Sequence, residues 1–198
     1  FGCFVFWNSM AARCSLVLSL LFLAALLCSS VYAKDASEKP AKKKGDMTAY
    51  QKRVAAKFIA ETAKKEGIYE LQSGMLVEIL KEGTKKKAKS PQAGDSCKVT
   101  YSGTLKDGTP FDSGTTSFAP NQVIKGWTEA MQLMGEGDKW KLYIPWNLAY
   151  GERGSPPKIG PYAPLVFEIE IHSVESGGKP VSEAREAFKK ALKQKAEL

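Results

Sequence analysis

Hydrophobic and polar residues alternate along four segments of the chain with a period of two residues. Successive side chains of a β-strand point to opposite faces of a sheet, so this alternation is typical of antiparallel strands with one buried face. Asp107-Gly108 predicts a hairpin turn after the second segment. Tyr143 falls on the polar face of its segment with Lys139 and Lys141. The predicted strands lie at 75–80, 97–102, 139–144 and 167–172, with apolar faces that include Cys97, Val99, Tyr101, Trp140, Leu142, Ile144, Phe167, Ile169 and Ile171.

Three other segments have helical patterns. Thr48 and Gln51 have the spacing of a capping box, and Gly67 suits a helix end, which together predict an N-terminal helix at 48–67. Residues 127–133 are apolar but span only about two helical turns, so they predict one short helix across the sheet. Ser182 is interpreted as the N-cap of a C-terminal helix at 180–198 with slight burial. Strands around one short helix predict an α+β fold.

Residues 1–33 have the features of a secretory signal segment. Arg13 precedes an apolar run at 16–27, and the small residue Ala33 lies where signal peptidase would cleave. A retained membrane anchor is the alternative, but the run is shorter than the roughly 18 apolar residues that a membrane span needs. Residues 1–9 precede the first methionine, Met10, and are expected to be upstream sequence or part of an incomplete gene model rather than protein.

The ends of the remaining chain are basic and polar. Residues 34–47 are rich in lysine and contain Pro40 with almost no apolar side chains, so they predict a flexible basic linker. The last four residues, 195–198, depart from the endoplasmic-reticulum retrieval signal at their second position. We therefore expect secretion rather than retention in the endoplasmic reticulum.

Charge and the counts of cysteine and histidine limit the partners and cofactors that we expect for this chain. The chain has 29 Lys and Arg residues against 21 Asp and Glu, a formal net charge of +8, but its basic residues form no nucleic-acid-binding motif, so no nucleic-acid partner is expected. Cys97 is the only cysteine outside 1–33, which excludes a disulfide in the rest of the chain and predicts a small buried residue. The sole histidine, His172, falls on a polar strand face. With no triad, metal cluster or phosphate loop in the sequence, neither a cofactor nor a metal is expected.

Aromatic and aliphatic residues recur between Val99 and Phe167 in a series of short motifs. They include VTYSG at 99–103, GTPFDS at 108–113, QVIKGW at 122–127, AYG at 149–151 and LVF at 165–167. Aromatic residues at alternate strand positions are ordinarily core residues, so the order of the motifs is more informative than any one residue. In this order the motifs resemble the FKBP family of peptidyl-prolyl cis/trans isomerases. The resemblance predicts an isomerase domain at 71–175.

The resemblance implies a curved antiparallel sheet wrapped around one short helix, with an apolar pocket between them. It implies an enzyme that accelerates rotation about X-Pro bonds of peptides and proteins, and a pocket that also binds tacrolimus- and rapamycin-type macrolides. Trp127 is then the floor under the proline ring, and the Ile124 N–H and the Tyr150 hydroxyl hold carbonyls on either side of the rotating bond. The expected catalytic set is Tyr101, Phe111, Asp112, Trp127, Tyr150 and Phe167, and the expected binding set is Val123, Ile124, Ile159 and Phe118.

Two loops depart from the common family pattern. The segment at 113–121 is short and lacks the arginine that often accompanies Asp112. In the later loop Ser155 stands where many members have histidine, and this second departure predicts an altered substrate preference beyond the proline. The leader, the N-terminal helix and the C-terminal module resemble the macrophage infectivity potentiator type. Because the segment before the module is short, we expect a monomer without stable membrane insertion. A binding module or chaperone with little turnover is the alternative function, and a host-directed effector that acts through its basic surface is a third.

Overall fold

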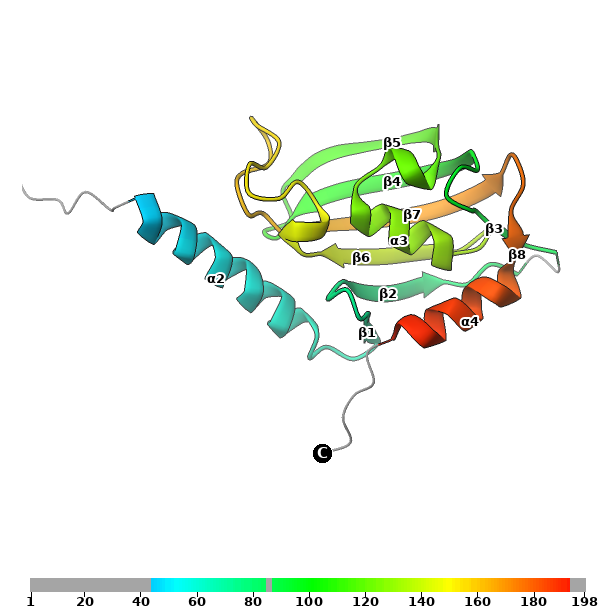
Figure 1. Cartoon of the computed structure of the whole chain (residues 1–198), viewed down its shortest axis with the longest axis horizontal. Helices are drawn as coiled ribbons and strands as arrows, with labels where there is room; N and C mark the ends of the chain where they lie inside the picture. Colours follow the sequence, from blue (N-terminus) through cyan, green and yellow to red (C-terminus); the bar gives the residue numbers. More distant parts are fainter. Residues whose placement is uncertain (1–43, 85–86, 193–198) are drawn as a thin grey trace, which may run out of the picture. The chain divides into compact units, whose positions relative to one another are not determined.

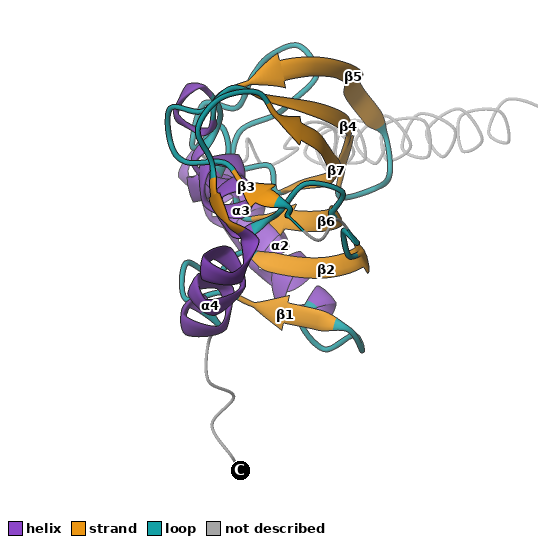
Figure 2. Cartoon of the chain, turned by 90° about the vertical axis from the view of Figure 1, so that its right-hand side faces the viewer, coloured by secondary structure: helices purple, strands orange, loops and turns teal. Residues whose placement is uncertain are grey.

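The computed structural model describes residues 44–84 and 87–192. Its main feature is a six-stranded sheet in the order β1-β2-β6-β7-β4-β5, in which neighbouring strands are antiparallel. Figure 2 shows this sheet as a curved wall with helix α3 on one face. The α+β fold with one short helix on an antiparallel sheet is therefore confirmed. The elements are β1 (Ile68–Glu70), β2 (Leu76–Lys81), β4 (Cys97–Leu105), β5 (Pro110–Phe118), α3 (Lys125–Leu133), β6 (Lys139–Ile144) and β7 (Leu165–Val174).

Shorter elements and two more helices complete the described part of the chain (Figure 1). None of its helices is both long and apolar enough to cross a membrane. The expected signal segment at 1–33, residues 34–43 of the expected linker and the tetrapeptide at 195–198 lie outside the described residues. The additional elements are α2 (Lys44–Thr62), β3 (Lys89–Ser90), η1 (Pro120–Gln122), η2 (Trp146–Leu148), β8 (Lys179–Pro180) and α4 (Val181–Ala191).

The main core lies between α3 and one face of the sheet. Trp127, Ala130 and Met131 of α3 are buried in the same cluster as the alternate residues of β6 and β7 that the sequence places on one face. Gly126 allows α3 to approach β6 closely, because a Cβ atom at this position would lie 2.6 Å from Cγ2 of Ile144. The short helix therefore holds Trp127 directly against the sheet.

The other face of the sheet is partly covered, which corrects the assignment of Tyr143 to an exposed polar face. Tyr143 is only 7 % exposed. Its ring centroid lies 6.3 Å from that of Phe58 on α2, and its hydroxyl donates a hydrogen bond of 3.0 Å to Glu78 Oε2. Leu76 and Val166 belong to the same small cluster. Strand periodicity shows which residues share a face, but it does not show that a helix from another part of the chain covers that face.

The N-terminal helix differs from its predicted bounds. The chain is already helical at Lys44 and the helix ends at Thr62, so Thr48 lies inside α2 and its interpretation as an N-cap is wrong. The residues at 44–47, expected in the flexible linker, belong to this helix. Gly67 has the positive φ of +76° expected of a left-handed residue, but it lies in the turn after the helix. The capping-box spacing is equally compatible with two positions in a helix interior, which explains the error.

The C-terminal helix is more buried than expected. Pro180, rather than Ser182, is the N-cap residue of α4. Phe188 is 7 % exposed, and its ring centroid lies 5.0 Å from that of Trp140 and 5.8 Å from that of Tyr69. The prediction of slight burial was wrong because charges on most faces of the helix conceal one narrow apolar face. The core therefore includes residues on both sides of the expected 71–175 range.

Candidate active site

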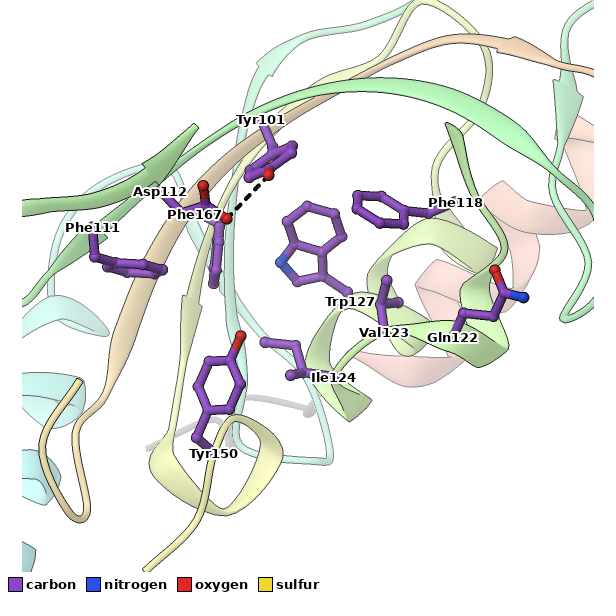
Figure 3. Close-up of a pocket in the computed structure, with 10 residues that line it drawn as sticks. All are labelled: Tyr101, Phe111, Asp112, Phe118, Gln122, Val123, Ile124, Trp127, Tyr150 and Phe167. Atoms are coloured by element: carbon purple, nitrogen blue, oxygen red, sulfur yellow. Dashed lines mark hydrogen bonds between the residues drawn. The ribbon is translucent and has the colours of Figure 1, made fainter. Parts of the chain in front are cut away.

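A cavity of about 390 Å³ opens between α3, strands β4, β5 and β7, and the loop that follows η2 (Figure 3). Nine of the ten residues expected at the site line it. They come from five separate parts of the chain, and the sheet order places β4 between β7 and β5 so that their side chains converge. The lining residues are Tyr101, Phe111, Asp112, Phe118, Gln122, Val123, Ile124, Trp127, Tyr150 and Phe167.

Trp127 is surrounded by other aromatic rings. Its ring centroid lies 5.1 Å from that of Phe167, 5.3 Å from Tyr101 and 6.0 Å from Phe118. The interplanar angles of 86°, 74° and 81° are those of edge-to-face pairs, a preferred arrangement of aromatic side chains. Phe111 makes a similar pair with Phe167 at 5.4 Å. These contacts fix the indole in one orientation, with 4 % of the residue exposed at the cavity.

The charged group of the cavity, Asp112, is held by a tyrosine. The Tyr101 hydroxyl donates a hydrogen bond of 3.0 Å to Asp112 Oδ2, and Figure 3 shows the pair at one edge of the cavity. Burial raises the pKa of Tyr101 above its ordinary value, and the hydrogen bond to Asp112 and its negative charge act in the same direction. Tyr101 therefore remains a proton donor to the carboxylate at neutral pH. The residue Asp112 is exposed rather than enclosed, because it lies at the open side of β5.

Two further polar groups lie near the aromatic rings. Tyr150 follows η2 and is 42 % exposed, and in Figure 3 its hydroxyl points into the cavity between Ile124 and Phe167. Ile124 is the N-cap residue of α3. The first N–H groups of a helix have no acceptor within the helix, so the backbone at Ile124 can donate to a ligand. The cavity thus combines an apolar floor with hydrogen-bonding groups at its rim.

One expected wall residue is not among the residues that line the cavity, and one lining residue was not named in advance. Ile159 is 4 % exposed and is packed in the main core, but it is not among the residues that line the cavity. Its loop closes on itself, with hydrogen bonds in both directions between the Ser155 and Ile159 backbones of 2.9 and 3.0 Å. Gln122 lines the cavity beside Val123. Its position within the QVIKGW motif was the signal that could have identified it.

The one free cysteine of the described residues, Cys97, does not line the cavity. Within 44–84 and 87–192, no three His, Cys, Asp or Glu side chains gather as metal ligands. Burial, followed by the charges of Glu175 and Asp95, raises the pKa of Cys97 to about 11, so its thiol is protonated at neutral pH. The site can bind and orient an uncharged group in a largely apolar environment.

Comparison with known proteins identifies the family. Residues 87–172 match the model of the FKBP-type peptidyl-prolyl cis-trans isomerases. A macrophage infectivity potentiator from Trypanosoma cruzi is 39% identical over 189 residues, which cover 92% of this chain and 93% of that protein. The crystal structure of a peptidyl-prolyl cis-trans isomerase from Pseudomonas syringae pv. tomato matches with a TM-score of 0.61 at 37% identity and covers 71% of this chain and 100% of its own. FkpA from Escherichia coli matches with a TM-score of 0.61 at 31% identity, covering 84% of this chain and 72% of its own.

The relative from Trypanosoma cruzi covers the chain almost from end to end, and solved isomerases share its fold. The chain therefore belongs to the FKBP-type peptidyl-prolyl cis-trans isomerases and is an enzyme of that family, similar to its macrophage infectivity potentiators.

Proposed function

We propose that the cavity around Trp127 binds the proline ring of an X-Pro substrate and that the chain is an exported isomerase. The observation that carries this proposal is the cavity itself, in which edge-to-face aromatic rings surround Trp127 while Tyr150 and Asp112 stand at its rim. Its volume of about 390 Å³ is within the range of small-ligand pockets. The same cavity is our candidate site for tacrolimus- and rapamycin-type macrolides.

The mechanism needs no covalent intermediate. Rotation about an X-Pro bond crosses a barrier of about 18–20 kcal/mol because amide resonance must be broken. An apolar site favours the twisted amide relative to the more polar planar one, and only interactions that are stronger in the twisted state accelerate rotation. The Ile124 N–H and the Tyr150 hydroxyl hold substrate carbonyls on either side of the bond. The Tyr101 hydroxyl holds the Asp112 carboxylate at 3.0 Å, and we assign this carboxylate either a contact with the twisted carbonyl or the orientation of neighbouring groups.

Export and module boundaries belong to the same proposal. A relative from Legionella longbeachae is named an outer membrane protein, which supports export, and the small residue Ala33 after the apolar run at 16–27 is our expected cleavage site. Mass spectrometry of the mature N-terminus checks that cleavage. We place the isomerase module at 71–175, with β1 and α4 as adjoining parts of its sheet and core, and infer that it acts as a monomer. Proline-containing segments of peptides and proteins are its expected substrates.

A protease-coupled isomerisation assay on a proline tetrapeptide tests the site. Tyr150→Phe removes one neutral hydrogen bond, worth about 0.5–1.5 kcal/mol, so we expect kcat/KM to fall about two- to tenfold. Asp112→Ala is expected to lower it as well, because the Tyr101 hydroxyl also loses its acceptor. Tyr69→Phe is the matched control, because Tyr69 is also 42 % exposed but does not line the cavity.

The same assay separates the isomerase from the binding module or chaperone, two of the three functions considered. If Tyr150→Phe and Asp112→Ala both retain the wild-type rate, the proposed site is wrong. If the wild-type protein binds the peptide tightly without accelerating its isomerisation, the alternative of a binding module or chaperone is favoured instead.

A further inference from the structure

Lys52 of α2 makes three contacts with one loop of the isomerase fold. Its Nζ atom lies 4.8 Å from the centroid of the Tyr162 ring, 5.6 Å from the centroid of the Trp146 ring and 3.7 Å from Glu152 Oε1. The two rings form an edge-to-face pair with centroids 5.1 Å apart. A lysine ammonium within about 6 Å of aromatic ring centroids makes a cation–π interaction. We name Lys52, Trp146, Glu152 and Tyr162 the Lys52 clasp.

The clasp is connected to Tyr150 through the backbone. Gly151, the residue after Tyr150, donates its N–H to the Trp146 carbonyl at 2.8 Å. The Gly151 carbonyl accepts the N–H of Tyr162 at 3.1 Å. Both aromatic partners of Lys52 are thus hydrogen-bonded to the residue next to Tyr150. Displacement of Trp146 or Tyr162 therefore shifts the backbone of Gly151, which is covalently bonded to Tyr150 at the cavity.

The backbone at Tyr162 indicates that this arrangement is specifically held. Tyr162 has a φ of +56°, and it is the only positive-φ residue other than glycine in the described part of the chain. The left-handed region is unfavourable for a residue with a Cβ atom, and such strain persists only where surrounding contacts compensate for it. The compensating contacts given above are the pair with Trp146, the ammonium of Lys52 and the hydrogen bond to Gly151.

We propose that Lys52 is a positioning residue for Tyr150, so that the N-terminal helix adjusts the isomerase site. The inference rests on the proposed function of Tyr150 in that site. Lys52 is not needed to attach α2, because Phe58, Ile59 and Ala63 near the helix end pack on the second core cluster. Loss of the lysine ammonium therefore releases the Tyr150 loop while the helix stays in place.

The test compares two lysines of the same helix in the full chain. Lys52→Met retains the length of the side chain but removes its charge, and Lys52→Arg restores a cation. Lys57→Met is the control, since Lys57 is paired with Glu61 on α2 itself and its side chain is 76 % exposed. We expect Lys52→Met to lower kcat/KM about two- to fivefold, the range that an exposed cation–π interaction allows. Lys52→Arg is expected to retain most of the activity, and Lys57→Met all of it.

Two measurements distinguish positioning from a general structural effect. In a Tyr150→Phe background, Lys52→Met should cause no further loss of kcat/KM, and equal losses in both backgrounds would overturn the proposal. The amide resonance of Gly151 should shift in Lys52→Met but not in Lys57→Met, and an unshifted resonance would also overturn it. If Tyr150→Phe alone leaves the rate unchanged, the catalytic part of the proposed function fails, while the Gly151 resonance still decides whether Lys52 positions this loop.

Discussion

Gly103 determines how closely two aromatic rings of the cavity wall can pack. A Cβ atom at this position would lie 2.6 Å from Cε1 of Phe167 and 2.7 Å from Cζ of Phe111. We expect Gly103→Ala to displace both rings, to lower the free energy of unfolding by about 1–3 kcal/mol and to weaken substrate binding. Denaturant unfolding and KM in the isomerase assay measure the two effects.

Gly114 provides the matched control for this prediction. It lies on β5 opposite Tyr101 of β4, and a Cβ atom there would meet the Tyr101 ring at 3.6 Å, an ordinary contact distance. Gly114→Ala should therefore leave stability and KM near the wild-type values. Equal behaviour of the two alanine variants would show that close packing at Gly103 does not shape the cavity.

Residues that line the cavity could be predicted from the sequence where a motif contains both the functional side chain and a neighbouring residue that sets its backbone conformation or packing. Trp127, for example, follows a glycine that permits close helix packing, and Tyr150 precedes another glycine. Ile159 lies in a loop with prolines and glycines whose course follows no periodic pattern, so whether its side chain lines the cavity could not be predicted. Gln122 is polar and exposed, so a pattern of hydrophobic residues does not identify it as a lining residue.

At the scale of elements, α4 is held to the sheet by a buried charge as well as by Phe188. Asp138 is 1 % exposed, and its carboxylate accepts hydrogen bonds from the N–H groups of Gly83 at 2.6 Å and Gly135 at 2.8 Å. Arg185 of α4 donates to the same carboxylate at 3.0 Å. We expect Arg185→Ala to lower the free energy of unfolding by about 1.5–3 kcal/mol, the usual contribution of a hydrogen bond to a charged group. Denaturant unfolding measures this loss.

Glu82 is the second acidic partner of Arg185 and provides the control for this prediction. Its side chain is 66 % exposed and lies 3.5 Å from Arg185, so Glu82→Gln should change stability by less than about 1 kcal/mol. Isomerase activity of folded Arg185→Ala should be normal, since no residue of α4 lines the cavity. A small stability change in Arg185→Ala, similar to that in Glu82→Gln, would contradict a structural function for the buried pair.

The elements that could be predicted are those whose own pattern determines their burial. Strand β7 alternates between apolar and charged residues from Phe167 to Ile171, and within this part its buried positions follow the alternation. The burial of Tyr143 and Phe188 instead depends on contacts between elements distant in the sequence. Helix ends are also hard to predict from a local pattern. The capping spacing at Thr48 does not exclude a helix that begins earlier, and α2 begins at Lys44.

At the scale of the whole molecule, two buried groups link global stability to alkaline pH. Burial, with the charges of Glu175 and Asp95, raises the pKa of Cys97 from 9.0 to about 11. Burial, with the hydrogen bond to Glu78, raises the pKa of Tyr143 from 10.0 to about 12. The two residues belong to different core clusters. Neither ionises readily in the folded protein, so the unfolded chain binds fewer protons at high pH and stability falls as the pH rises.

For Cys97 this effect is confined to a window between pH 9 and about 11. Below pH 9 the thiol is protonated in both states, and above about pH 11 it is ionised in both. We expect Cys97→Ala to be less stable than the wild type below pH 9, because it loses buried contacts. The wild type alone then loses thiol-linked stability as the pH rises, so the difference between the two unfolding free energies should narrow across this window. Denaturant unfolding at pH 8, 9, 10 and 11 measures that difference, and the other ionisable groups cancel in it. A constant difference over this range would mean that the thiol ionises as easily in the folded protein as in the unfolded chain.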